Sequence, residues 1–302
     1  EIYTLSLHDA LPISGIGPGR TICGSSPAIV GSTGTSTGTS TGTSTGTSGT
    51  GSLGGLGSIL SSALSSNSLS GGTVSTGWTH TANTGKLNTS VASGAREKRT
   101  QIVGNGKDVV TIMVYMCGTD LETNSAAATR DLNEMINASI DNKNLNLIVY
   151  TGGCKRWRND VISSTYNQVW QIRNGNIKCL EQNAGNPSMT KDSTLSSYIR
   201  YVNKYFPSNR TALIFWDHGG GSIGGYGYDE KYPNTGSMSL SGIKTALTDA
   251  NVKFDFIGFD TCLMATTETT LILDDFADYM IGSEETEPGI GWYYTGWLSD
   301  LN

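Results

Sequence analysis

The stretches Thr211-Ala-Leu-Ile-Phe-Trp-Asp-His-Gly-Gly-Gly221 and Phe254-Asp-Phe-Ile-Gly-Phe-Asp-Thr-Cys262 decide the fold of this chain. Each contains a short, β-rich apolar run bounded by turn residues, which predicts a buried strand. The first run ends at His218 and the second at Cys262. In an open α/β sheet, chemistry collects at the carboxyl ends of the strands. An imidazole and a thiol placed there indicate covalent catalysis by a nucleophile and its acid–base partner.

Strand and helix patterns alternate from Asp108 onward. This alternation predicts a mainly parallel sheet with helices on both faces, that is, a three-layer α/β/α sandwich. Besides the two runs above, we expect strands near residues 109–116, 145–150 and 279–282, and a hairpin made of 168–172 and 177–180 around Asn174-Gly175. We expect helices near residues 124–138, 192–206, 240–249 and 263–276.

The composition of the 302 residues is uneven. Residues 31–75 are almost wholly Gly, Ser, Thr, Leu and Ala without charge, so they bury too little apolar surface to offset their ordering entropy. We therefore assign residues 20–106 to a disordered Gly/Ser/Thr-rich tether and residues 107–302 to the folded domain. Residues 1–14 resemble translated sequencing-adapter DNA, so we treat residues 1–19 as non-native. We also expect the domain to be truncated at its C-terminus, because the chain stops soon after an aromatic-rich segment without a terminal cap.

Charge and cysteine content exclude several classes of protein. The net charge of −6 and the lack of a basic stripe argue against a nucleic-acid partner. No apolar stretch reaches the roughly 18 residues that a membrane-spanning helix needs. The five cysteines show neither C-x-x-C spacing nor the density of a disulfide framework, which fits buried thiols and one reactive thiol. Cys23-Gly-Ser-Ser26, near the start of the tether and ahead of its polar repeats, faintly resembles a lipoprotein anchor.

The residues around the two strand ends are the candidate site. Glycines 219–221 allow the main chain to approach a ligand, so that its N–H groups can bind a developing oxyanion; the plainer alternative is a flexible turn. Cys262 is expected at a helix N-terminus, which lowers the pKa of a thiol. Asp260 lies two residues earlier, on the same side of an extended chain, and can share a pocket suited to a cationic group. Asp260 or Thr261 could instead be a helix N-cap.

Two rival chemistries are less consistent with the sequence. Gly220-Gly-Ser222-Ile-Gly224 fits the G-x-S-x-G pattern of esterases, but it overlaps the candidate oxyanion glycines, and no histidine follows Ser222. A metal centre is not expected, because one domain histidine and scattered cysteines offer no zinc-ligand spacing.

Four segments in order resemble the clostripain family of cysteine peptidases: Thr111-Ile-Met-Val-Tyr-Met-Cys-Gly-Thr-Asp-Leu-Glu122, Phe215-Trp-Asp-His-Gly-Gly-Gly221, Gly258-Phe-Asp-Thr-Cys-Leu-Met264 and Ser283-Glu-Glu-Thr-Glu-Pro-Gly289. The resemblance covers roughly residues 108–302. It implies a caspase-like fold and an endopeptidase that cuts after Arg or Lys. It also implies that His218 is the catalytic histidine, Cys262 the nucleophile and Asp260 the carboxylate that reads the basic side chain. Thr261 departs from the alanine that is usual in the family at this position.

Further roles are expected from this reading. The amides of Gly219 and Cys262 are the candidate oxyanion hole, and Glu284 and Glu285 add negative potential around the cleft unless they are plain loop acids. Several members of the family are activated by self-cleavage in the loop after the histidine, so we predict cleavage after Lys231. The segment 96–99, Arg-Glu-Lys-Arg, is a second candidate processing site.

The sequence therefore predicts a bacterial cysteine endopeptidase, secreted or tethered to the cell surface, that acts on protein or peptide substrates with Arg or Lys. We expect a monomer that requires no cofactor, with calcium dependence left open because no contiguous calcium loop is present. The alternative is a non-catalytic binding module, a pseudo-peptidase, on a flexible cell-surface stalk.

Overall fold

The computed structural model describes residues 3–5 and 94–302, in which the strands join in one sheet. Their bounds are β1 (Tyr3–Leu5), β2 (Val110–Cys117), β3 (Leu145–Gly152), β4 (Gln168–Arg173), β5 (Asn176–Glu181), β6 (Arg210–Trp216), β7 (Phe254–Asp260) and β8 (Ala277–Ile281). The strand order is β1-β8-β7-β6-β2-β3-β4-β5. Only the β3–β4 and β4–β5 pairs are antiparallel, so the predicted mainly parallel sheet and its hairpin are both confirmed.

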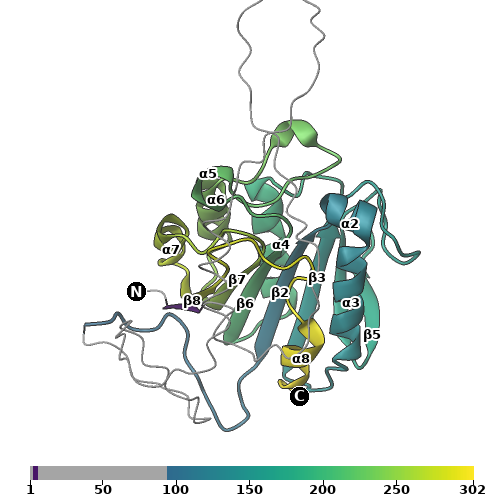
Figure 1. The fold of residues 1–302 in the computed structure, drawn as a ribbon. Helices are drawn as coiled ribbons and strands as arrows, with labels where there is room; N and C mark the ends of the chain where they lie inside the picture. Colours follow the sequence, from purple (N-terminus) through teal and green to yellow (C-terminus); the bar gives the residue numbers. More distant parts are fainter. Residues whose placement is uncertain (1–2, 6–93) are drawn as a thin grey trace, which may run out of the picture. The chain divides into compact units, whose positions relative to one another are not determined.

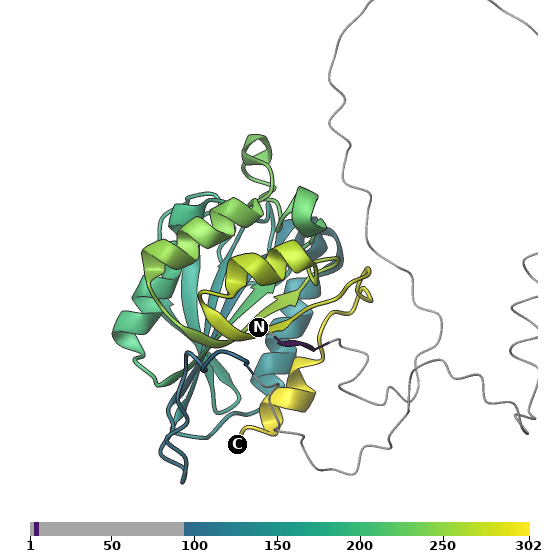
Figure 2. The ribbon, with the colours of Figure 1, turned by 90° about the vertical axis from the view of Figure 1, so that its left-hand side faces the viewer.

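Helices cover both faces of this sheet (Figure 1, Figure 2). Helices α4 (Asp192–Tyr205), α6 (Leu240–Ala250) and α7 (Thr267–Leu273) pack on one face, and α3 (Ala127–Asn137) and α8 (Tyr294–Ser299) pack on the other. Successive strand residues face opposite layers, as a period of two requires: Tyr115 joins the core under α4 and α6, whereas Val114 joins the core under α3. The three-layer α/β/α sandwich is therefore confirmed, and the parallel strands are buried on both sides.

The register of the two central strands positions the site. In the parallel pair β6–β7, Trp216 is aligned with Asp260, and these residues are the last of their strands. His218 and Cys262 each follow two residues later. Both side chains therefore leave the sheet at the same edge, as the sequence predicted.

Two helix predictions are wrong in their boundaries. The expected helix 124–138 begins only at Ala127, in α3, because Ala126 adopts a left-handed conformation with φ of 54°. The residues before it form a separate helix, α2 (Thr119–Ser125), that was not predicted. The expected helix from Leu263 begins only at Thr267, since Leu263 has a φ of 65° and Thr266 is the N-cap, accepting a hydrogen bond from the Thr269 N–H. Cys262 is consequently not at a helix N-terminus, and the prediction that a helix N-terminus lowers the pKa of its thiol is wrong.

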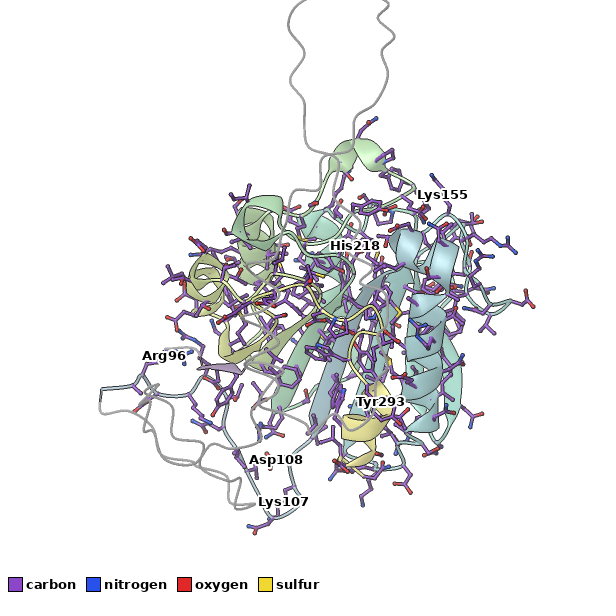
Figure 3. All side chains as sticks on the ribbon, in the orientation of Figure 1. Arg96, Lys107, Asp108, Lys155, His218 and Tyr293 are labelled. Atoms are coloured by element: carbon purple, nitrogen blue, oxygen red, sulfur yellow. The ribbon has the colours of Figure 1, made fainter. Side chains whose placement is uncertain are left out.

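The segment 96–100, which the sequence analysis placed in the tether, contacts the folded domain. Arg96 donates from Nε to Asp274 (2.9 Å) and from Nη1 to Asp278 (3.0 Å). The carboxylate of Asp278, itself buried, also accepts the N–H groups of Arg99 (2.7 Å) and Thr100 (3.0 Å). Figure 3 shows Arg96 well apart from His218. The second candidate processing site is thus held against β8.

Residues 3–5, treated as non-native in the sequence analysis, form the edge strand β1 and pair with β8. The Gly/Ser/Thr-rich residues 20–93 and the candidate anchor Cys23 lie outside the described residues. No helix among the described residues is both long and apolar enough to span a membrane.

Replacing Asp278 with alanine is expected to lower the free energy of unfolding by about 1–3 kcal/mol, because it leaves the N–H groups of Arg99 and Thr100 without their acceptor. The hydrogen bonds outweigh burial and lower the pKa of Asp278, so this difference should shrink as the pH falls through the acid range. Urea unfolding at several pH values measures it. Asp275→Ala, at an exposed neighbouring acid, is the control and should change stability by less than about 0.5 kcal/mol. Equal losses in both variants would contradict the prediction.

Candidate active site

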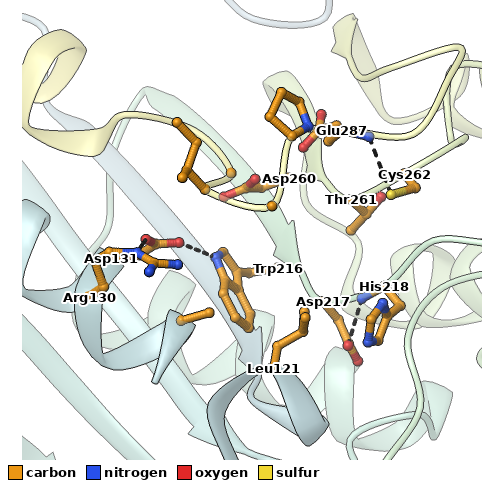
Figure 4. Close-up of a pocket in the computed structure, with 15 residues that line it drawn as sticks. Leu121, Arg130, Asp131, Trp216, Asp217, His218, Asp260, Thr261, Cys262 and Glu287 are labelled. Carbon is orange, nitrogen blue, oxygen red and sulfur yellow. Dashed lines mark hydrogen bonds and ion pairs between the residues drawn. The ribbon is translucent and has the colours of Figure 1, made fainter. Parts of the chain in front are cut away.

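A cavity with an empty volume of about 450 Å³ lies at the carboxyl ends of β6 and β7 (Figure 4). The residues that line it come from five regions of the chain: Leu121, Ala127, Arg130, Asp131, Trp216, Asp217, His218, Asp260, Thr261, Cys262, Glu287, Pro288, Gly289, Ile290 and Gly291. The structure therefore brings the predicted histidine, cysteine and aspartate to one pocket.

The main chain before His218 is fixed by the buried carboxyl group of Asp217. Asp217 Oδ1 accepts the N–H of His218 (2.6 Å) and the hydroxyl of Thr119 (3.0 Å), and Oδ2 accepts the N–H of Tyr228 (3.0 Å). Burial raises the pKa of Asp217 to about 7, although His218 and these donors oppose the rise. Asp217 thus joins three chain segments and sets the position from which the imidazole projects.

Asp120 is the partner of the His218 ring, and sequence reasoning gave it no role. Asp120 Oδ1 lies 2.9 Å from His218 Nε2 and accepts the hydroxyl of Tyr228 at 2.7 Å. The Tyr228 ring stacks on the imidazole, with 5.7 Å between centroids. Burial works against the charged imidazolium, but Asp120 and Asp217 outweigh it, so the pKa of His218 is raised. In turn, the hydrogen bond from His218 lowers the pKa of Asp120 to about 2.

This hydrogen bond orients the imidazole. With Nε2 held by Asp120, the other ring nitrogen, Nδ1, is left for a reacting group. A carboxylate that supports a histidine in this way stabilises the protonated ring and fixes its rotation. The signal in the sequence was weak, because Asp120 lies almost 100 residues before its partner.

Cys262 lies in the turn that follows β7 and is 6% exposed. Its sulfur accepts the main-chain N–H of Glu287 at 3.3 Å, and the next residue, Leu263, donates its N–H to the carbonyl of Glu285 at 2.9 Å. The loop 283–289 therefore holds the cysteine turn by main-chain contacts. Cys262 is disulfide-bonded in this structure, so nucleophilic chemistry requires its reduction to the thiol.

The remaining described cysteines are poorly suited to attack. Burial raises the pKa of the Cys117, Cys154 and Cys179 thiols. None of them lines the cavity. Cys262 is the cysteine that shares a pocket with an imidazole.

Gly219 joins the histidine loop to the cysteine turn. A Cβ on Gly219 would lie 2.0 Å from the carbonyl oxygen of Cys262 and 2.8 Å from the Oγ1 of Thr261, so any side chain here would force the two loops apart. The main chain of the predicted oxyanion glycine therefore closely contacts the turn that carries Cys262. This contact is the physical reason for glycine at this position.

Asp260 occupies the pocket floor and is buried. Its carboxylate accepts the main-chain N–H of Trp292 (3.1 Å) and the hydroxyl of Tyr294 (2.8 Å). Burial raises the pKa of Asp260, and these donors partly counteract the rise. A buried carboxylate in a pocket beside a thiol can bind a cationic side chain of a ligand.

Two further buried acids belong to this floor, and the sequence analysis gave neither a role. Asp131 from α3 accepts the indole N–H of Trp216 at 2.7 Å. Glu287 hydrogen-bonds Asp260, and burial followed by the Asp260 charge raises the pKa of Glu287. A signal for Asp131 was present, because it lies one helical turn before Met135 on the apolar stripe of its helix.

The other predicted residues lie outside the pocket. Glu284 and Glu285 are exposed and do not line the cavity, and the same loop instead contributes Glu287. Lys231 is half-buried, and its ammonium group donates to Asn186 at 2.6 Å. Desolvation lowers the pKa of Lys231. Cleavage after Lys231 would therefore require this loop to leave its present contacts.

A model of the Clostripain family, Peptidase C11, matches residues 114–301. Among solved structures, the chain is similar to a secreted C11 cysteine protease from Bacteroides thetaiotaomicron in complex with an irreversible peptide inhibitor, with 26% identity and a TM-score of 0.52 over 64% of this chain and 54% of that one. An inactive zymogen C11 protease from Parabacteroides distasonis is 26% identical, with a TM-score of 0.50 over 64% of this chain and 54% of that one. No curated protein matches the chain.

A further structure of a secreted C11 cysteine protease from Bacteroides thetaiotaomicron, "iotapain", is 22% identical with a TM-score of 0.52, covering 65% of this chain and 57% of that one, and bears on the fold alone. The chain spans slightly more than half the length of these relatives.

Replacing Asp120 with asparagine should lower the pKa of His218, because an amide cannot stabilise the imidazolium as the carboxylate does. The chain has three histidines, so the His218 ring protons can be assigned in a one-dimensional NMR titration by comparison with His218→Gln. Asp160→Asn, at an exposed acid, is the matched control and should leave the titration unchanged. An unaltered His218 titration in the Asp120 variant would contradict the assigned pairing.

Proposed function

The chain belongs to the clostripain family of cysteine peptidases, and from this membership we propose that it is a cysteine endopeptidase that cleaves on the carboxyl side of Arg or Lys. The observation that carries the proposal is the shared pocket of His218, Cys262 and Asp260. A thiol, an imidazole supported by a carboxylate and a buried acid together supply the nucleophile, the proton shuttle and the anchor for a basic side chain.

The reaction proceeds through a thioacyl-enzyme. The thiolate of Cys262, in its reduced form, attacks the carbonyl carbon that follows the Arg or Lys residue and forms a tetrahedral intermediate. The His218 imidazolium then protonates the leaving amine as the C–N bond breaks. In the second half, His218 takes a proton from water, the hydroxide attacks the thioester, and the thiol leaves with its proton restored.

The main-chain amides of Gly219 and Cys262 are the proposed oxyanion hole. The close approach of Gly219 to the Cys262 turn supports this assignment, because the two N–H groups belong to loops in direct contact. Fixed donors of this kind bind the negative oxygen of the intermediate more strongly than the neutral carbonyl.

Asp260 is proposed to read the basic side chain of the substrate. Its burial means that a neutral side chain in the pocket would leave the carboxylate without a cationic partner, which is costly. A guanidinium or ammonium group gains charge-assisted hydrogen bonds instead.

Secretion is proposed from the similarity to the secreted C11 protease of Bacteroides thetaiotaomicron. If the protein stays on the cell surface, the Gly/Ser/Thr-rich residues that precede the segment 96–100 are the proposed stalk. The alternative function is a non-catalytic binding module on that stalk. The presence of both His218 and Cys262 in one pocket favours the enzyme, since a binding module needs neither.

Self-activation by cleavage after Lys231 is a further part of the proposal. The similarity to an inactive zymogen of Parabacteroides distasonis supports it. Because the Lys231 ammonium group donates to Asn186 and lies outside the cavity, we propose that cleavage occurs between molecules or after this loop is released.

Fluorogenic peptide amides ending in Arg or Lys should be hydrolysed by the reduced full chain, and Cys262→Ala should abolish turnover. Asp260→Asn should lower kcat/KM for both substrates by about a hundredfold, because the desolvated charge that pairs with the substrate is lost. Ser222→Ala, which removes the serine of the esterase-like pattern, is the control and should keep full activity. Turnover that survives in Cys262→Ala would favour the serine chemistry or a contaminant over this proposal.

Intact-mass measurement tests the self-cleavage. The wild-type chain should separate into two fragments at the Lys231–Tyr232 bond, whereas Cys262→Ala and Lys231→Ala should stay intact there. Adding wild-type protein to the Cys262→Ala chain should restore cleavage if it occurs between molecules. Identical processing of wild type and Cys262→Ala would exclude self-cleavage.

A further inference from the structure

Asp131 is a buried acid whose hydrogen bonding is incomplete. Its side chain is 2% exposed, and its Oδ2 accepts the indole N–H of Trp216 at 2.7 Å. Its Oδ1 has no hydrogen-bond partner among the described residues. The Nε of Arg130 is 4.0 Å from that oxygen, beyond hydrogen-bond distance, on a side chain that is 45% exposed. A buried carboxyl oxygen without a hydrogen-bond partner is unfavourable when the group is charged, so Asp131 must either keep a proton or receive a donor that enters the pocket.

Gly291 leaves open the space between Asp131 and Asp260. A Cβ on Gly291 would lie 2.9 Å from Asp260 Oδ1 and 3.5 Å from Asp131 Oδ2. Both carboxyl groups line the same cavity as His218 and Cys262. A cationic group that enters from the nucleophile side and reaches this space can therefore contact both acids.

We propose that Asp131 is a second specificity residue of the pocket, which gives up a proton when a cationic side chain enters and then binds that cation together with Asp260. The inference rests on the proposed function, because it assigns the cation to a basic substrate side chain. In the balanced step, the carboxylic acid of Asp131 releases one proton to solvent and becomes a carboxylate, and the guanidinium or ammonium keeps its charge. In the empty pocket, Asp131 is neutral and does not place a second negative charge beside Asp260. In the filled pocket, Asp131 is charged and adds a second carboxylate to bind the cation.

The surroundings of Asp131 support a stored proton. Burial, followed by the charge of Asp260, raises the pKa of Asp131. The charged and titratable groups that interact with Asp131 are Arg130 and Glu134 on α3, Asp260 at the end of β7 and Tyr294 on α8. Three more titratable groups line the same cavity, namely Glu287 on the loop after β8, and Asp217 and His218 after β6. Acids outnumber cations in this set, so the neutral form of Asp131 is favoured until a cation arrives.

The sign of the pH dependence follows from this arrangement. A cation binds the charged carboxylate, so below the raised pKa of Asp131 each binding event must first remove a proton. Affinity for a basic group should therefore rise as the pH increases through the neutral range and level off above it. A neutral group of the same shape should show no such rise.

Calorimetric binding of n-butylguanidinium to the reduced full chain tests the proposal, with uncharged n-butylurea as the matched ligand. Titrations in two buffers of different ionisation enthalpy, between about pH 6 and pH 9, count the protons released over the range where the raised carboxyl titrates. Wild type should release a proton near neutral pH and bind more tightly as the pH rises. Asp131→Asn keeps an acceptor for Trp216 and should bind roughly tenfold to a hundredfold more weakly without proton release.

Asp160→Asn, the same chemical change at an exposed loop acid, should retain wild-type affinity and proton count. Circular dichroism and thermal melting establish that each variant is folded, and the wild-type proton count tests the idea without any mutation. Binding by wild type without proton release, unchanged binding in Asp131→Asn, or no binding of n-butylguanidinium at all would overturn the inference. A failure of the peptidase proposal would be seen in a different experiment, the fluorogenic peptide assay, as hydrolysis that does not depend on Cys262.

Discussion

The parallel register of β6 and β7 is the constraint on which the site depends. Because Trp216 is aligned with Asp260, the two strands end at the same level, and the loops that carry His218 and Cys262 leave one edge together. A slip of one residue would turn Asp260 away from the pocket and separate the thiol from the imidazole. Gly219 reinforces the alignment, since its main chain contacts the Cys262 turn so closely that no side chain fits between them.

The pocket separates two groups of acids with opposite tasks. Asp120 and Asp217 surround His218 and favour its protonated ring. Asp131, Asp260 and Glu287 lie on the floor, where burial raises the pKa of each carboxyl group. Buried carboxyl groups of this kind destabilise an empty pocket unless they share protons, and a bound cation relieves that cost. The selectivity that we propose for a basic side chain would follow from desolvation and charge, rather than from pocket shape alone.

The sequence predicted what local patterns determine. Short, β-rich apolar runs predicted the strands, and their alternation with helical patterns predicted the three layers. The ends of the strands predicted that His218, Cys262 and Asp260 are neighbours. The left-handed residues Ala126 and Leu263 were missed, because non-glycine residues with positive φ carry no clear signal in residue type. These two turns moved the predicted helix starts. The floor acid Asp131 and the histidine partner Asp120 were missed because their contacts join segments distant in sequence.

The family resemblance explains why the motifs occur together, whereas the structure explains how they act. Within the motif 283–289, the sequence predicts that Glu284 and Glu285 add negative potential around the cleft, but both are exposed. The structure shows that the buried member, Glu287, lines the cavity, and that its main-chain N–H donates to the sulfur of Cys262. Burial, which the sequence pattern did not resolve, distinguishes a loop acid from a pocket acid.

The central claim is that Cys262 is the nucleophile of a pocket that accepts a basic side chain. Treating the reduced full chain with a peptidyl-arginine acyloxymethyl ketone, followed by peptide mapping, tests it most directly. The account predicts one adduct on Cys262 and none on the buried Cys117 or Cys154. In Asp120→Asn, formation of the Cys262 adduct should be strongly slowed or lost. An adduct on another cysteine, or rapid labelling of Cys262 by a matched peptide ending in citrulline, would contradict it.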